Sequence, residues 1–200
     1  KDYDCSIIDS RTFSNNLIAV MNAVDTQYVL FVYKDVVVDY DGIVKELSVY
    51  KSRKDICSID LKIFDKENKI LSGGAFFGDR NGLSVRPRCI GGGRDYYGYE
   101  NALLYTRSVV CSFGLCTVVD KTTWNPELCF ESEKSIGVSL MRYSDKARAT
   151  GVMNLLLPYY EARCLSAAGK DELLSSLSDC GIEYQRDPYF NISVLTMNLE

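Results

Sequence analysis

The hydrophobic pattern is clearest between Gln27 and Phe77, where four apolar runs are separated by charged or glycine-containing breaks. Val, Ile, Leu, Phe and Tyr dominate the runs, and these residues fit a pleated, half-buried surface. The breaks contain Asp, Lys, Asn and Gly, which permit the chain to reverse. The pattern predicts a β-meander whose strands cover residues 28–40, 43–50, 57–63 and 69–77.

The third of these runs alternates most strictly between apolar and polar residues. Its odd positions are Cys57, Ile59, Leu61 and Ile63, and its even positions are Ser58, Asp60 and Lys62. Successive side chains of a strand point to opposite faces of the sheet. We therefore expect the odd face to be buried and the even face to contact solvent.

Strands and turns are also predicted after this meander. Residues 78–82 predict a tight reversal, because Asn81-Gly82 favours the positive φ angles of hairpin turns. Residues 89–100, with the sequence CIGGGRDYYGYE, predict a loop, because consecutive glycines have high backbone entropy and pack no side chain. Further strands are predicted at 102–111, 115–119, 128–131 and 135–143.

Helical spacing appears near both ends of the chain. Apolar residues recur at intervals of three and four within residues 9–24, which predicts an N-terminal helix. The same period returns from Ser144 to Cys164, where Pro158 either kinks one helix or begins a second. A shorter helix is predicted at 170–180, ending before Gly181.

The order of these elements predicts one α+β domain over residues 1–200. Its β-rich body, residues 1–143, is expected to be mainly antiparallel, as a sandwich or a barrel-like meander with an N-terminal helix. The remainder, residues 144–200, is expected to be a C-terminal helical segment followed by a closing strand at 189–199.

Composition excludes several classes of function. The chain has no histidine, which removes the usual general base of hydrolases and the commonest zinc ligand. Its net charge of −4 provides no basis for nucleic-acid binding, which needs clustered Lys and Arg. No apolar run approaches the roughly 18 residues of a membrane-spanning helix. We therefore expect a non-enzymatic protein with no catalytic residues, metal, cofactor, nucleic-acid partner or membrane span. The alternative is an enzyme that uses a cysteine or a carboxylate without histidine.

Eight cysteines are spread over the chain, at Cys5, Cys57, Cys89, Cys111, Cys116, Cys129, Cys164 and Cys180. An even number of this kind predicts up to four disulfides in an oxidising compartment. The alternative is a set of free thiols that pack as small apolar side chains in a reducing cell. The closest group, Cys111, Cys116 and Cys129, does not have the spacing of a zinc site.

Two further observations concern location. The chain begins at Lys1, and if this is a mature terminus the protein is expected to be secreted or lumenal; the alternative is cytoplasmic. Asn191-Ile192-Ser193 is a glycosylation sequon, which has meaning only in a secreted protein.

The glycine and tyrosine loop is the predicted recognition surface. Arg94, Tyr96, Tyr97 and Tyr99 are residue types that supply binding energy at protein interfaces, and glycines let a backbone approach a ligand. The alternative is a surface loop whose tyrosines cover the core of the domain itself.

The sequence thus predicts a non-enzymatic protein-binding module, secreted or displayed, stabilised by disulfides and using this loop for recognition of a protein partner. One alternative is a structural protein that self-associates in a coat, crystal or filament. Another is an intracellular accessory domain with free thiols, of the kind that viral proteins contain.

Overall fold

The structure is a computed structural model that describes residues 9–13, 16–80, 83–98, 101–129, 135–183 and 188–189. The helices are α1 (Leu17–Ala23), α2 (Tyr40–Tyr50), α3 (Ile136–Ala149) and α4 (Ala167–Asp179), with short 3-10 helices at Ser10–Phe13, Lys121–Thr123 and Pro126–Leu128. The strands are β1 (Tyr28–Val32), β2 (Val36–Val38), β3 (Ile56–Phe64), β4 (Ile70–Ser72), β5 (Ala75–Arg80), β6 (Leu83–Pro87), β7 (Arg107–Val109), β8 (Cys116–Asp120) and β9 (Met153–Cys164).

Seven strands form one mixed sheet in the order β1-β8-β3-β9-β2, with β4 paired to β3 and β7 paired to β9. All pairings in this sheet are antiparallel except that of β3 with β9. A second, two-stranded sheet joins β5 to β6. The predicted α+β class, with a mostly antiparallel sheet and helices near both ends of the chain, is confirmed.

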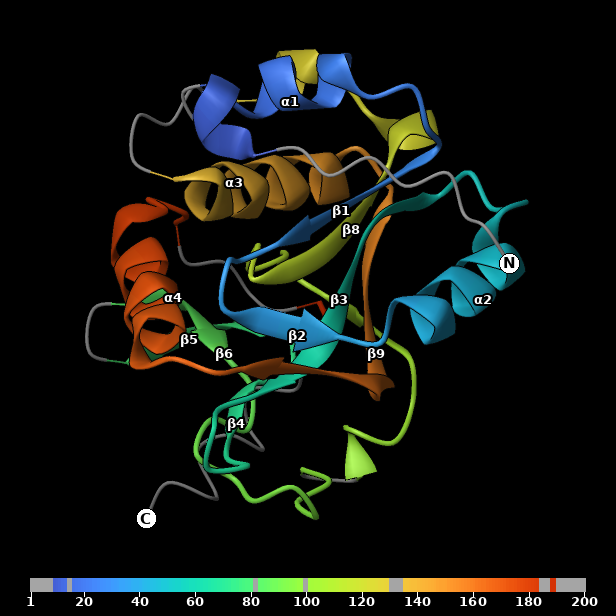
Figure 1. Cartoon of the computed structure of the whole chain (residues 1–200). Helices are drawn as coiled ribbons and strands as arrows, with labels where there is room; N and C mark the ends of the chain where they lie inside the picture. Colours follow the sequence, from blue (N-terminus) through green and yellow to red (C-terminus); the bar gives the residue numbers. More distant parts are fainter. Residues whose placement is uncertain are drawn as a thin grey trace.

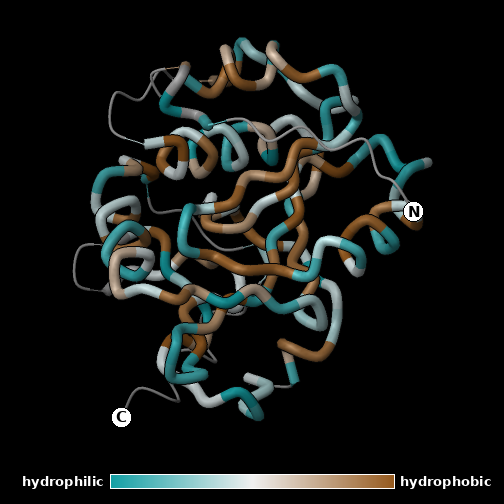
Figure 2. Tube along the Cα trace, in the orientation of Figure 1, coloured by the Kyte–Doolittle hydropathy of each residue, from teal (hydrophilic) through white to brown (hydrophobic). Residues whose placement is uncertain are grey.

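Figure 1 shows where the helices lie relative to the sheet. The helix α3 packs on β3 and β9, and α1 lies on the far side of α3. The helix α4 packs against α3 and β9. Hydrophobic residues concentrate along the central strands (Figure 2). None of the described helices is both long enough and apolar enough to cross a membrane.

Two of the predicted strands in the meander have different structures. The first, at 28–40, is broken at Lys34 and Asp35, and its halves β1 and β2 lie at opposite ends of the sheet. The second, at 43–50, is the helix α2. Asp39 caps this helix, since its side chain accepts a hydrogen bond from the Gly42 N–H at 3.2 Å.

The strand prediction at 43–50 was wrong because two periods fit the same residues. Ile43 and Leu47 are four residues apart, so they share one face in either a helix or a strand, and both are buried. Val49, which the strand interpretation placed on that buried face, is 66% exposed. The burial of Ile43 and Leu47 fits both structures, and the exposure of Val49 fits only the helix.

Helix and strand are exchanged in the last third of the chain. Residues 135–143, predicted as a strand, begin the helix α3, where the Ser135 hydroxyl accepts a hydrogen bond from the Val138 N–H. The strand β9 (Met153–Cys164) lies within the stretch 144–164 that was predicted as helical, and it runs parallel to β3. Strands of parallel pairs are buried on both faces and read as continuous apolar runs, which removes the alternation that identifies other strands.

Smaller corrections concern strand ends. The run 69–77 is divided into β4 and β5 at Gly73 and Gly74, and the predicted strand 102–111 is reduced to β7. Leu128 lies in a 3-10 helix rather than in the predicted strand 128–131, of which Glu131 lies outside the described residues. The predictions at 115–119 and 170–180 are confirmed by β8 and α4.

Several predictions concern residues outside the described ranges. These are the turn residues Asn81 and Gly82, the sequon residue Asn191 and nearly all of the closing strand 189–199. Arg80 of β5 pairs with Leu83 of β6 across the predicted turn. The expected division at residue 144 falls within α3, so the two predicted parts of the chain share one helix and, through β3 and β9, one sheet.

The strand β3 is buried on both faces, contrary to the prediction of a wet even face. Ser58, Asp60 and Lys62 are all less than 6% exposed. Ser58 and Asp60 are enclosed because α3 and the segment that precedes β8 cover this face. The polar residues on β3 therefore need partners within the protein.

Candidate recognition surface

The glycine half of the loop is bonded to β4. The Ile70 N–H donates to the Gly92 carbonyl at 2.8 Å, and the Gly91 N–H donates to the Ile70 carbonyl at 2.7 Å. Lys69 and Gly93 form a further antiparallel bridge. These bonds continue the ladder of the sheet into the loop and fix its position.

Two of the three glycines, Gly91 and Gly92, are required by the geometry of this attachment. Gly91 has a φ of +81°, in the left-handed region that favours glycine. A Cβ atom on Gly92 would lie 2.7 Å from Tyr96 Cδ1 and 3.1 Å from the Cys89 carbonyl oxygen. The ring of Tyr96 therefore lies against the Gly92 backbone, and the glycine sequence positions this tyrosine.

The structure places Arg94, Tyr96 and Tyr97 at the surface. Tyr96 is 50% exposed and Tyr97 is 44% exposed, so neither ring is absorbed into the core. The Arg94 side chain is 57% exposed. Tyr99, the fourth predicted residue, lies outside the described residues.

Arg94 is paired with a carboxylate of the sheet. Its Nη2 atom lies 2.8 Å from Oε2 of Glu161 on β9, and Oε1 of the same residue lies 3.3 Å from Nζ of the buried Lys62. An exposed ion pair such as that of Arg94 contributes only about 0.2–1 kcal/mol. Its effect is positional, because it joins the loop to β9.

A bulge in β9 presents two more tyrosines beside this loop. Leu61 of β3 pairs with Leu157, but the next residue, Lys62, pairs with Glu161. The three intervening residues, 158–160, thus have no partner on β3. Pro158 suits this position because it has no N–H to donate to the ladder.

The bulge also marks a change of neighbour along β9. Leu156 pairs with Arg107 of β7 before the bulge, and Ala162 pairs with Val38 of β2 after it. Bulges often redirect side chains next to functional sites. Here the redirected side chains are those of Tyr159 and Tyr160, whose ring centroids lie 5.2 Å apart at an interplanar angle of 61°.

The two bulge tyrosines are held from α2 and from the segment before β7. The Tyr159 hydroxyl donates to Oε1 of Glu46 at 3.0 Å and lies 2.8 Å from the Thr106 hydroxyl. The Tyr160 hydroxyl donates to Oε2 of the same Glu46 at 3.4 Å. Burial, followed by the nearby Glu46 carboxylate, raises the pKa of Tyr160, so the phenol remains a donor at neutral pH.

Loop and bulge form one surface because two contacts connect them. Arg94 contacts Glu161 and Thr106 contacts Tyr159, so both ends of the segment 94–106 meet β9 at positions two residues apart. The exposed large apolar side chains of this tyrosine surface are Ile90, Tyr96, Tyr97, Leu104, Tyr105 and Tyr159.

Sequence reasoning missed the bulge half of this surface. The sequence predicted helical structure over 144–164, which contains Tyr159 and Tyr160, and a strand over 43–50, which contains Glu46. The available signal was Pro158 directly after three leucines, because proline within a strand pattern indicates an edge or a bulge.

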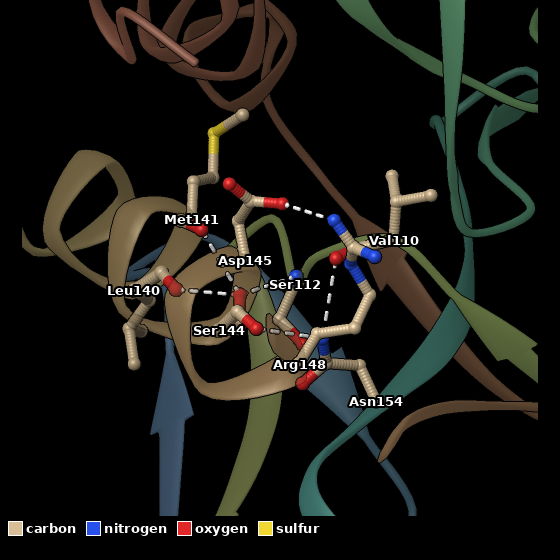
Figure 3. A network of polar contacts seen from close by, with 8 residues as sticks. All are labelled: Val110, Ser112, Leu140, Met141, Ser144, Asp145, Arg148 and Asn154. Carbon is tan, nitrogen blue, oxygen red and sulfur yellow. Dashed lines mark hydrogen bonds and ion pairs between the residues drawn. The ribbon is translucent and has the colours of Figure 1, made fainter. Parts of the chain in front are cut away.

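Ser58 of β3 belongs to a separate network in the interior, and Figure 3 shows the part of it around Ser112, Ser144 and Asn154. The Ser58 hydroxyl donates to Oδ1 of Asn154 at 2.7 Å and lies 2.6 Å from the Ser112 hydroxyl. The Asn154 amide donates to the carbonyls of Val110 at 3.2 Å and Ser144 at 2.9 Å. The side chains of Ser58, Ser112, Ser144 and Asn154 are at most 1% exposed. This network therefore joins β3, β9 and α3 rather than meeting a substrate.

The seven described cysteines are free thiols, so the predicted disulfides are not formed among them; Cys5 lies outside the described residues. Five of the seven are buried, and Cys89 and Cys129 are half-buried. Burial raises the pKa of Cys57, Cys116 and Cys129 to about 12. These thiols are protonated at neutral pH and are therefore poor nucleophiles.

We expect the protein, unfolded without any reductant, to take up at least seven alkyl groups in an intact-mass measurement. The folded protein should react far more slowly, because packing excludes the reagent and the raised pKa removes the thiolate. A mass that gains alkyl groups only after reduction would contradict the free-thiol structure.

No group of three or more His, Cys, Asp or Glu side chains suited to a metal ion occurs within the described ranges. The fold and the tyrosine surface together define an α+β domain with a preformed aromatic face. Comparison of the chain with protein-family models and with curated proteins finds no match.

Proposed function

We propose that the chain is a non-enzymatic protein-binding module that recognises a protein partner through the tyrosine surface. The observation that carries the proposal is the exposure of Tyr96, Tyr97, Tyr105 and Tyr159 on segments bonded to the sheet. Tyrosine provides a large contact area with only two rotatable side-chain bonds, so it loses little conformational entropy on binding.

Preorganisation supports the same proposal. The loop is fixed by its bonds to β4, the Tyr96 ring is packed on Gly92, and Tyr159 is held by two hydroxyl contacts. A surface that is already ordered loses less freedom when a partner binds, which leaves more of the contact energy as affinity.

The non-enzymatic part of the proposal rests on the state of the polar side chains. The interior serines and Asn154 are closed to solvent, and burial raises the pKa of the thiol at six of the seven described cysteines, which disfavours cysteine nucleophiles. The free thiols also support a reducing compartment, as in the alternative of an intracellular accessory domain.

Replacing Tyr96 and Tyr97 by alanine is expected to weaken partner binding by about 100-fold, since two interface tyrosines that each contribute about 1.4 kcal/mol have this combined effect. The test uses the immobilised protein to isolate a partner, followed by titration calorimetry with the purified partner. Leu174→Ala, at an exposed apolar residue of α4, is the matched control and should retain full affinity. Unchanged affinity in Y96A/Y97A would place the binding site elsewhere.

Self-association is the second candidate, and the sheet topology favours it specifically. Among the described strands, β1 and β2 stand at the two ends of the sheet order, and Val37 of β2 is exposed. Unpaired strand edges are templates for pairing with another chain. Light scattering over a wide concentration range should then show oligomers that Val37→Lys disperses, whereas a monomer throughout would contradict this candidate.

A further inference from the structure

Glu46 is surrounded by aromatic rings and has unused capacity to accept hydrogen bonds. Each of its carboxylate oxygens accepts one tyrosine hydroxyl, from Tyr159 and from Tyr160. An ionised carboxylate offers about four acceptor positions, so about two remain. The side chain lies at the surface, half-buried on α2.

The ion pairs of the described residues distinguish Glu46 from its neighbour Glu161. Glu161, the other carboxylate beside the bulge, is paired with both Lys62 and Arg94. By contrast, Glu46 forms no ion pair within the part of the chain that the structure describes. A second carboxylate, that of Asp39, lies near the Tyr160 ring. A Cβ atom on Gly42 would lie 2.9 Å from Oδ2 of Asp39 and 2.8 Å from Cε1 of Tyr160, so the two side chains flank the same position.

The two rings add a further attraction for positive charge. Aromatic faces carry negative quadrupole potential, so a cation over such a face is attracted to it even at an exposed site. Tyr159 is 50% exposed, which leaves part of its ring available to a ligand. Carboxylate and ring together match a planar guanidinium, which binds a carboxylate through two hydrogen bonds and stacks on aromatic faces.

We propose that Glu46, Tyr159 and Tyr160 form a binding site for an arginine side chain of the protein partner. This inference rests on the proposed function, because it assigns the chemistry of the residue that the partner inserts. The arginine site adjoins the loop through two contacts. Tyr159 is bonded to Thr106, which follows the exposed Tyr105. Glu161, two residues beyond Tyr159, is bonded to Arg94 of the loop. One arginine-bearing segment can therefore contact both halves of the tyrosine surface.

The test is an NMR titration of the whole chain, with labelled tyrosine rings, against N-acetyl-arginine amide. We expect saturable shifts of the Tyr159 and Tyr160 ring signals. N-acetyl-citrulline amide has nearly the same shape without the charge and should bind at least about tenfold more weakly. N-acetyl-lysine amide should fall between them, because its ammonium does not bind a carboxylate through a planar pair of hydrogen bonds.

Variants locate the site. Glu46→Gln should weaken arginine binding by about fivefold to tenfold, whereas the matched control Glu67→Gln, in an exposed turn, should leave it unchanged. Tyr159→Phe keeps the ring and should retain binding within about threefold, while Tyr159→Leu should lose it. If E46Q does not fold, the comparison of arginine with citrulline on the unaltered protein still decides the outcome.

The titration is independent of any partner, so the two proposals fail separately. Equal binding of arginine and citrulline, or shifts that E46Q leaves unchanged, would overturn the arginine site while leaving the loop proposal intact. Retained partner affinity in Y96A/Y97A, together with arginine binding that depends on Glu46, would instead overturn the proposed function of the loop.

Discussion

Replacing Asp60 by asparagine is expected to remove most of the pH dependence of stability between about pH 4 and pH 7. Asp60 is a buried carboxyl on β3, and burial raises its pKa to about 7, against hydrogen bonds that favour the charged form. Those bonds come from the Thr117 hydroxyl at 2.5 Å and the Phe113 N–H at 3.1 Å. They do not offset the loss of hydration.

The direction of the effect follows from proton binding. The ordinary pKa of an aspartate is about 3.9, so between about pH 4 and pH 7 the folded protein holds a proton on Asp60 that the unfolded chain releases. The free energy of unfolding therefore falls by about 1.4 kcal/mol for each pH unit in this range and becomes level above about pH 7. Asparagine does not titrate, and its amide is compatible with the same partners.

Urea unfolding from pH 4.5 to pH 8.5, followed by the fluorescence of the single Trp124, measures this directly. Between pH 5 and pH 8 the unaltered protein should lose about 3 kcal/mol of unfolding free energy that D60N does not lose. The difference in unfolding free energy between D60N and the unaltered protein should therefore shift by about 3 kcal/mol in favour of D60N. Asp41→Asn, at an exposed position of α2, should keep the original slope. An identical pH slope in D60N would show that Asp60 does not titrate in this range.

Replacing Asn154 by alanine is expected to destabilise the protein by about 3 kcal/mol, because its loss leaves several buried groups unsatisfied. Asn154 is fully buried on β9, and it bonds Ser58 on β3 as well as the carbonyls of Val110 and Ser144. No water can replace the amide without a cavity of suitable size. Chemical unfolding at constant pH provides the measurement.

Two further variants show whether the network is responsible. Asn22→Ala, at an exposed position of α1, should change stability by less than about 0.5 kcal/mol. Ser58→Ala alone should cost about 1 kcal/mol, and its effect should be partly lost in the Asn154→Ala background, because the two residues share a hydrogen bond. Fully additive effects would indicate that Ser58 and Asn154 contribute separately.

The loop shows how much of the candidate site the sequence predicts. Three consecutive glycines and the adjacent tyrosines predicted a loop at residues 89–100, and in its described part Tyr96 and Tyr97 are exposed. The bulge was not predictable in the same way. Glu46 and Tyr159 are 113 residues apart in the chain, and they meet only because α2 lies beside the bulge.

Local chemistry by itself determined those elements for which one period explained every residue. The strand β8 and the helix α4 were predicted at nearly their observed bounds, as was the loop, whose glycines demand irregular backbone. The absence of histidine was likewise a matter of sequence alone: no histidine of this chain can act as a general base or a metal ligand, since no fold can supply a missing side chain.

Tertiary structure decided the rest, because the apolar residues of α2, α3 and β9 satisfy more than one period and only packing selects among them. The helix α3 and the segment before β8 cover the face of β3 that was expected to be wet, and this packing encloses Asp60 and Asn154. The parallel pairing of β3 with β9, interrupted at residues 158–160, turns Tyr159 and Tyr160 toward Glu46. Long-range packing and strand pairing thus produced the buried polar network and the arginine site.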